Sequence, residues 1–243
     1  MNLYYKILWC LLTVMTLGIF ASFASENKQT VYLIPGQGAD ARLYKNLELD
    51  TAFQEKHIDY YTPQKGWDME TFARELAKQI DTTEPFSIIG VSLGGMLATE
   101  MADFLRPEKV IVISSAKCRK EFPGRYRLQK VVPVYWMVPG FAIKAGARIL
   151  QPIVEPDRNK DKSTFKSMLR NKDPKFLKRT TTMILTWKRE DYRENIIHIH
   201  GDLDKTLPPR FVNFDYLVED GSHMMVLTRG DLISELVNQI LKE

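Results

Sequence analysis

The sequence predicts an α/β fold, with a mostly parallel central sheet and helices on both of its faces. Short runs rich in β-branched and aromatic residues recur along the chain, and stretches with the apolar period of a helix lie between several of them. The chain has 243 residues, of which 44% are hydrophobic and 26% charged. It can therefore bury a sizeable core, and its composition excludes a disordered or collagen-like protein.

The strands are predicted from residue type and from the turns that bound them. Thr30–Ile34 runs into the tight-loop sequence Pro35-Gly36-Gln37-Gly38. The further predicted strands are Lys56–Tyr61, Phe86–Val91, Lys109–Ser114, Asn195–His200 and Phe214–Val218. Helices are predicted where apolar residues recur every three or four positions: after the N-cap Asp68, at Leu93–Leu105 and at Asp231–Leu241.

Residues 1–25 have the features of a secretory signal peptide. Lys6 precedes the apolar run Ile7–Phe20, and small residues follow up to Ser25. The run has 14 residues, which is short of the roughly 20 residues that a membrane-spanning helix needs. We expect export to the periplasm or medium after cleavage behind Ala24, with a retained membrane anchor as the alternative.

The alternation of strands and helices is interrupted by a long segment, residues 117–194. Its length is too great for a structureless loop and predicts a helical lid. We expect this lid to be inserted into a core made of residues 26–116 and 195–243. From Lys117 to Asn195 there are 20 lysines and arginines against 8 acidic residues. This charge is either a solvated basic surface or a surface that attracts anionic lipid, glycolipid or an acidic acyl substrate. The same segment contains the apolar stretch Val131–Phe141. This stretch either packs in the core of the lid, forms a wall of the pocket for an acyl chain, or is a flap that dips into a membrane.

The composition also limits the cofactors and partners. A net charge of +4 is too small to predict nucleic-acid binding. Cys10 lies in the signal segment, so Cys118 is the one cysteine left for the body of the chain, which excludes an internal disulfide framework and a cysteine-rich zinc site. We expect no metal and no cofactor.

The strongest motif is the segment around Ser92. A buried strand runs directly into Gly90-Val91-Ser92-Leu93-Gly94-Gly95, and a helix-forming stretch follows. A nucleophilic serine needs this strained strand-to-helix turn, in which side chains at Gly90 or Gly94 would collide with the neighbouring backbone. The motif alone also occurs by chance in glycine-rich turns, but the strand before it and the helix after it favour a nucleophile elbow.

An acid and a histidine follow the serine in the order that such a site requires. Asp204 comes just after the strand that ends at His200, and it is the preferred acid, with Asp202 as the weaker alternative. His223 lies between the last strand and the last helix, from where it can reach over the strand ends toward Ser92. His57, His198 and His200 are less well placed for this role, because they precede or lie within strands.

These three segments resemble the α/β-hydrolase superfamily over nearly all of the chain after residue 25. The resemblance implies that Ser92 is the nucleophile, His223 the general base and Asp204 its orienting acid. It also implies that the backbone N–H groups of Gln37 and Leu93 form the oxyanion hole. Pro35 departs from the histidine often found before the first glycine of that loop.

Two further departures concern the sheet. From the resemblance we expect the first strand of this chain to correspond to the family's third strand, and the two edge strands of the family to be absent. Only ten residues separate Asp204 from Asp215, where the family commonly has a helix. This side of the sheet is therefore expected to be thinly covered or open to a partner, which makes an oligomer possible.

The predicted function is that of a serine hydrolase which cleaves a carboxylic ester or thioester of a small molecule through a covalent acyl-enzyme. Amidase, acyltransferase and perhydrolase chemistry use the same residues and stay open. The alternative from another class is a catalytically silent member that uses the same pocket to bind a ligand or a protein.

Overall fold

The computed structural model describes residues 28–124, 126 and 138–243, so the predicted signal peptide lies outside the described residues. Six strands form one sheet in the order β2-β1-β3-β4-β5-β6, and every neighbouring pair is parallel. The α/β fold predicted from the sequence is confirmed. The strands are β1 (Gln29–Ile34), β2 (Phe53–His57), β3 (Phe86–Val91), β4 (Val110–Ile113), β5 (Ile196–Gly201) and β6 (Tyr216–Val218).

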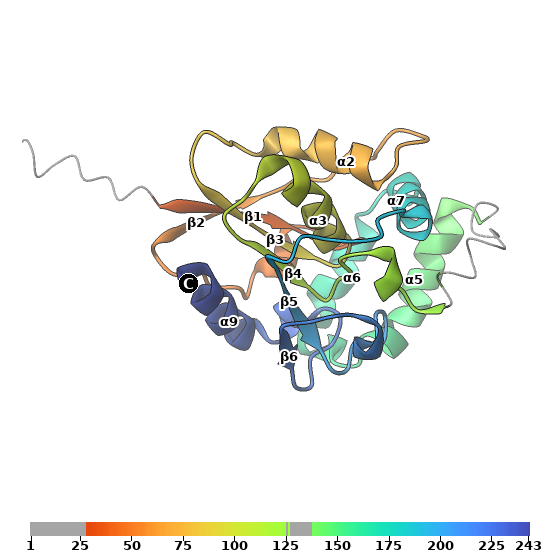
Figure 1. Ribbon diagram of the computed structural model, residues 1–243. Helices are drawn as coiled ribbons and strands as arrows, with labels where there is room; N and C mark the ends of the chain where they lie inside the picture. Colours follow the sequence, from red (N-terminus) through yellow and green to blue (C-terminus); the bar gives the residue numbers. More distant parts are fainter. Residues whose placement is uncertain (1–27, 125, 127–137) are drawn as a thin grey trace, which may run out of the picture.

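Helices cover both faces of the sheet (Figure 1). The helices α2 (Met69–Leu76) and α3 (Leu93–Leu105) pack on one face, and α8 (Met225–Thr228), α9 (Gly230–Lys242) and the 3-10 helix η1 (Ala41–Tyr44) on the other. Alternate residues of each central strand enter the two cores, since successive side chains of a strand point to opposite faces. In β1, for example, Tyr32 packs with α2 and Leu33 with α9.

The edge strands are where the predicted bounds were wrong. The prediction placed a strand at Lys56–Tyr61, but β2 spans Phe53–His57. At the edge of the sheet the middle of β2 is exposed and polar, so it lacks the apolar signal of a buried strand. That signal came instead from Ile58 and Tyr60, which pack into the core after the strand has ended. The other edge strand, β6, likewise begins at Tyr216 and not at Phe214.

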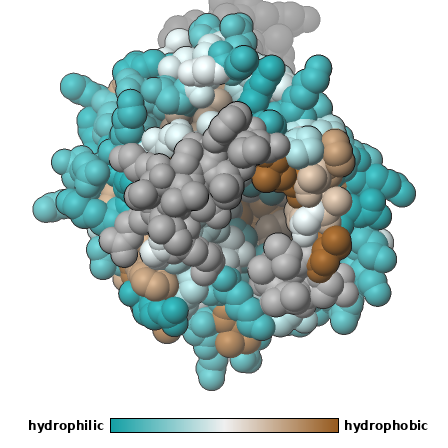
Figure 2. All heavy atoms as spheres, turned by 90° about the vertical axis from the view of Figure 1, so that its right-hand side faces the viewer, coloured by the Kyte–Doolittle hydropathy of each residue, from teal (hydrophilic) through white to brown (hydrophobic). Residues whose placement is uncertain are grey.

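The segment between β4 and β5 is largely helical in its described part. It contains α5 (Gly140–Val154), α6 (Lys162–Arg170) and α7 (Pro174–Thr186), with short 3-10 helices η3 (Arg119–Glu121) and η5 (Arg158–Asp161). These helices lie together on the right-hand side of Figure 1, and Figure 2 shows this face as mostly hydrophilic with apolar surface around a hollow.

The apolar stretch Val131–Phe141 lies outside the described residues except for its last four positions, of which Phe141 on α5 is 71% exposed. Ile149 on the same helix is 72% exposed. No helix within the described ranges is both long and apolar enough to cross a membrane.

The first turn of α3 lies directly against the end of β1. A Cβ at Gly94 would come within 2.0 Å of the Ile34 carbonyl oxygen, and a Cβ at Gly90 within 2.3 Å of the Gly94 carbonyl oxygen. These collisions are with backbone, which cannot rotate away as a flexible side chain can. The expectation that both positions exclude a side chain is therefore confirmed.

Gly94→Ala is expected to lower the free energy of unfolding by about 3 kcal/mol or more, because the methyl group must displace the end of β1. Gly146→Ala is the matched control, since Gly146 also lies within a helix but a Cβ there would meet nothing within 4 Å. We expect it to raise stability by about 0.5–1 kcal/mol. Urea unfolding measures both changes. Equal effects of the two substitutions would contradict the close approach of the Ile34 carbonyl to Gly94.

Candidate active site

Ser92 occupies a strained turn between β3 and α3. Its backbone has φ 54° and ψ −116°, a conformation that residues with a side chain rarely adopt. The Ser92 N–H donates to the Ile113 carbonyl at 3.0 Å, which ties the turn to the neighbouring strand β4. The Ser115 hydroxyl donates to the Ser92 carbonyl at 2.7 Å. Both the N–H and the carbonyl group of Ser92 are therefore hydrogen-bonded to residues at the end of β4, which holds the strained turn in place.

The structure brings Ser92, His223 and Asp204 together at the carboxyl edge of the sheet. His223 Nε2 lies 2.9 Å from the Ser92 Oγ, and His223 Nδ1 lies 2.7 Å from Asp204 Oδ2. The other carboxylate oxygen of Asp204 accepts the backbone N–H groups of Thr206 and Leu207, both at 2.8 Å. Both carboxylate oxygens of Asp204 therefore accept hydrogen bonds, and the imidazole is held with Nδ1–H toward the acid and Nε2 toward the hydroxyl.

The electrostatic surroundings favour a basic imidazole. Burial acts to lower the pKa of His223, but the Asp204 carboxylate raises it, through its charge and its hydrogen bond, above the ordinary histidine value. Asp204 is 2% exposed and His223 is 7% exposed, so water screens this attraction little. Asp202, the alternative acid, does not contact the imidazole, and its buried Oδ1 has no hydrogen-bond partner among the described residues.

The two predicted oxyanion donors lie in the loop after β1 and in the first turn of α3. A Cβ at Gly36 would lie 3.4 Å from the Ser92 Cβ, so the loop containing Gln37 passes directly beside the serine. Within the described part of the chain, the backbone N–H groups of Gln37 and Leu93 have no hydrogen-bond acceptor. Two donors left open next to Ser92 are what stabilisation of an oxyanion requires.

The side chain of Gln37 has a separate role. Its amide Nε2 donates to the Thr180 and Thr181 hydroxyls at 2.7 and 2.9 Å and to the Leu177 carbonyl at 3.1 Å, all on α7. The loop after β1 is thereby hydrogen-bonded to the segment between β4 and β5, a contact that no pattern in the sequence predicts.

Two buried histidines beside the acid were also missed. His198 and His200 on β5 are fully buried, and His200 Nε2 lies 3.6 Å from Asp204 Oδ2. Their position within a strand predicts no role in the site. The usable signal was their spacing of two, which places both side chains on one face of β5 and directs them together toward the same surroundings.

A further missed residue is Glu155, which directly follows α5. It is 5% exposed, and its Oε2 has no hydrogen-bond partner among the described residues. Burial raises its pKa to about 7; the charges of Asp204 and Asp157 add to this rise, while His223 and the Ser222 hydroxyl oppose it. A carboxyl that titrates near neutrality therefore lies within electrostatic reach of the imidazole. No motif marks Glu155, because only the folding of the segment brings it there.

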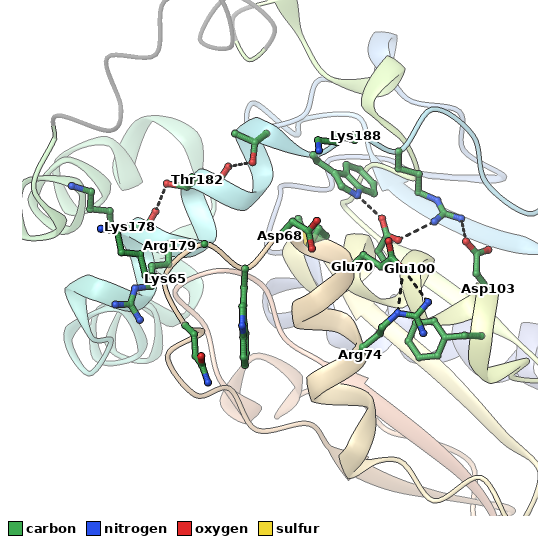
Figure 3. A pocket seen from close by; sticks show the side chains of 18 of the residues that line it. Lys65, Asp68, Glu70, Arg74, Glu100, Asp103, Lys178, Arg179, Thr182 and Lys188 are labelled. Carbon is green, nitrogen blue, oxygen red and sulfur yellow. Dashed lines mark hydrogen bonds and ion pairs between the residues drawn. The ribbon is translucent and has the colours of Figure 1, made fainter.

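The described residues hold no cluster of three or more His, Cys, Asp or Glu side chains suited to a metal ion. A wide groove of about 1250 Å³ lies elsewhere, between α7 and the start of α2. Figure 3 shows Lys65, Lys178 and Arg179 at one end of this groove and Glu100 and Asp103 at the other. None of its lining residues belongs to the cluster around Ser92, so the groove is separate from the candidate active site.

Comparison with known proteins places the chain in a family. Residues 42–191, more than half of the chain, match the model of a family described as Uncharacterised protein family (UPF0227). The chain belongs to this family. The part that matches the UPF0227 model includes Ser92 and Leu93, and it ends before Asp204 and His223. No curated protein matches the sequence.

Solved structures show the fold. An enol-lactonase from Burkholderia xenovorans LB400 is 17% identical, with a TM-score of 0.70 over 89% of this chain and 92% of that chain. An esterase from Thermogutta terrifontis is 17% identical, with a TM-score of 0.65 over 88% and 89%. A lipase-esterase related protein from Clostridium acetobutylicum ATCC 824 is 13% identical, with a TM-score of 0.62 over 89% and 96%. This member of UPF0227 therefore has the α/β-hydrolase fold.

Glu155→Gln is expected to change how stability depends on pH. The native carboxyl binds its proton up to a pKa of about 7, whereas the unfolded one releases it near 4.5. Wild-type stability therefore decreases as pH rises from 4.5 to 7, by about 3 kcal/mol at about 1.4 kcal/mol per pKa unit. The variant lacks this loss, so the difference in free energy of unfolding between the two proteins should grow in its favour over this interval.

Urea unfolding at pH 5 and pH 8 measures that difference. Glu84→Gln is the matched control, because Glu84 is exposed. The free energy of unfolding of this variant should stay within about 0.5 kcal/mol of the wild-type value at both pH values. A Glu155→Gln difference that is the same at both pH values would show that Glu155 is not buried beside the site in the folded protein.

Proposed function

We propose that this protein is a serine hydrolase that cleaves a carboxylic ester or thioester. The observation that carries the proposal is the unbroken path of hydrogen bonds from the Ser92 hydroxyl through His223 to the buried Asp204 carboxylate. The three groups come from loops after β3, β5 and β6. A protein that only binds a ligand would not need a serine, a histidine and an aspartate aligned in this way.

In the proposed reaction the Ser92 Oγ attacks the acyl carbonyl carbon while His223 Nε2 takes the hydroxyl proton. The negative charge that forms on the carbonyl oxygen is stabilised by the backbone N–H groups of Gln37 and Leu93. The imidazolium then gives its proton to the leaving alkoxide or thiolate, which departs and leaves an acyl group on Ser92. Water, deprotonated by the same imidazole, releases the acid and restores the hydroxyl.

Asp204 contributes to the proposed reaction in two ways. Its hydrogen bond to Nδ1 keeps the unprotonated Nε2 directed at the serine, and its charge stabilises the imidazolium that forms in each half-reaction. The raised pKa of His223 agrees with the second role. The strained backbone at Ser92 supports the first step, because it holds the Oγ outside the helix and free for attack.

The substrate class proposed is a small-molecule acyl compound. An esterase and an enol-lactonase are among the proteins of similar fold, and the bond that both names imply is a carboxylic ester, open-chain or cyclic. Ser92 in place of an aspartate at the turn favours this acyl chemistry over dehalogenation or epoxide opening. A panel of esters of increasing acyl length identifies the preferred substrate.

A fluorophosphonate probe is expected to label the wild-type protein and not Ser92→Ala, because the probe reacts with an activated serine hydroxyl. Ser163→Ala is the control: Ser163 is an exposed serine of α6, and its replacement should leave labelling unchanged. Intact-mass measurement reports the adduct. A folded wild-type protein that takes up no probe would contradict the hydrolase and favour a catalytically silent binding protein.

Asp204→Asn and Asp202→Asn separate the two candidate acids. Asp204→Asn should lower kcat by about ten-thousandfold on any ester that is turned over, because an amide can hold the imidazole in the wrong tautomer and cannot stabilise the imidazolium. Asp202→Asn should change kcat little, since Asp202 does not contact His223. Equal losses in the two variants would overturn the assignment of Asp204.

A further inference from the structure

His198 and His200 form a buried pair directly behind Asp204. Their ring centroids are 5.0 Å apart and the ring planes are nearly perpendicular, at 88°. This arrangement directs a nitrogen of each ring toward the other, with His200 Nδ1 lying 3.1 Å from His198 Nε2. Both side chains are fully buried, so water does not supply alternative partners.

The remaining ring nitrogens contact backbone carbonyl oxygens. His198 Nδ1 lies 2.9 Å from the Asn213 oxygen, and His200 Nε2 lies 2.8 Å from the Leu207 oxygen. A carbonyl oxygen can only accept a hydrogen bond, so each of these two nitrogens needs a proton. The Ser115 N–H, in turn, donates to His198 Nε2 at 3.4 Å, which marks that nitrogen as an acceptor.

The number of protons follows from these contacts. His198 carries its proton on Nδ1 and has a lone pair on Nε2. The contact between the rings is then a hydrogen bond only if His200 Nδ1 also carries a proton, in addition to the one on His200 Nε2. Two neutral imidazoles hold two N–H protons. Three are needed for the contact between the rings and for the contacts with the Asn213 and Leu207 carbonyl oxygens. A neutral pair would leave one close contact between two lone pairs in a buried site, which is costly.

We propose that His198 and His200 together hold one proton more than two neutral rings, that His200 is the imidazolium, and that it is a positioning residue for Asp204. The count of protons stands on the contacts of the pair alone. The positioning role rests on the proposed function, in which Asp204 is the acid beside the catalytic histidine.

Charges on several elements act on the pair. Burial lowers the pKa of both rings below the ordinary histidine value, and the neighbouring His200 and the Lys117 ammonium lower that of His198 further. On His200 the Asp204 carboxylate, 3.6 Å from Nε2, and the Leu207 carbonyl act in the opposite direction without offsetting burial, and His223 lowers the pKa further, so the contact geometry alone supports the third proton. The Asp215 carboxylate accepts the backbone N–H of His198 at 2.7 Å. The titratable groups around the pair are Asp204 and Asp215 between β5 and β6, Lys117 and Glu121 after β4, and His223 after β6.

The pair can position Asp204 because both act on the same short loop. The Leu207 N–H donates to Asp204 Oδ1, and the Leu207 carbonyl accepts from His200 Nε2. His200 therefore holds one end of the peptide segment whose other groups orient the carboxylate, while its charge attracts Asp204 Oδ2, the oxygen that also contacts His223. Loss of the imidazolium would release this loop without removing any group that touches a substrate.

Nitrogen NMR of the full chain labelled with ¹⁵N-histidine tests the proton count without reference to activity. At pH 7 we expect both nitrogens of the His200 ring to give N–H signals, and His198 to show one protonated and one unprotonated nitrogen. The signals are assigned by single substitutions, with His57→Gln as the control that should leave the pattern of the pair unchanged. Two neutral rings at pH 7 would overturn the proposal, whatever the protein catalyses.

His200→Gln tests the positioning role. Glutamine can still donate to the Leu207 carbonyl but cannot carry a proton. We expect kcat to fall by between about tenfold and a hundredfold with KM unchanged, and the pH profile of kcat to shift, because the charge next to Asp204 is lost. A variant with wild-type kcat and pH profile would refute the role. If the variant does not fold, the wild-type spectrum still decides the proton count.

Discussion

The backbone contact between the end of β1 and the first turn of α3 is the constraint on which the site depends. The Ile34 carbonyl approaches Gly94 so closely that only glycine fits there, two residues after Ser92, whose backbone has a positive φ. The same contact places the loop after β1 beside the serine. The N–H groups of Gln37 and Leu93, which have no acceptor among the described residues, belong to this loop and to the first turn of α3.

The second determinant is the burial of charge around His223. Asp204 is enclosed by backbone donors, and Glu155 enters the same region from the segment between β4 and β5. In such surroundings each charge acts strongly on its neighbours, because little water is present to screen it. The pKa values of the imidazole and of Glu155 are thus coupled properties of the cluster, and a change in one group alters the other.

The segment between β4 and β5 is more than a cover for the sheet. Gln37 hydrogen-bonds to α7, Glu155 follows α5, and Phe165 of α6 belongs to the hydrophobic core that also contains residues of α9. The position of this segment is thereby connected to the loop after β1 and to the imidazole of His223. Its excess of lysine and arginine contributes to a separate groove along α7, in which Lys178 and Arg179 lie at one end, and Lys188 lies at the other end near Glu100 and Asp103 (Figure 3).

The sequence alone determined the all-buried strand β3, the turn at Ser92 and the order of serine, acid and histidine, because each depends on short-range rules: strand alternation, turn glycines and the meeting of parallel strand ends at one edge. It misplaced the edge strand β2, whose exposed middle lacks an apolar pattern. Only the tertiary structure decided that Glu155 and the pair His198–His200 lie beside Asp204, since these contacts join segments far apart in the chain and no local pattern encodes which buried polar groups will meet.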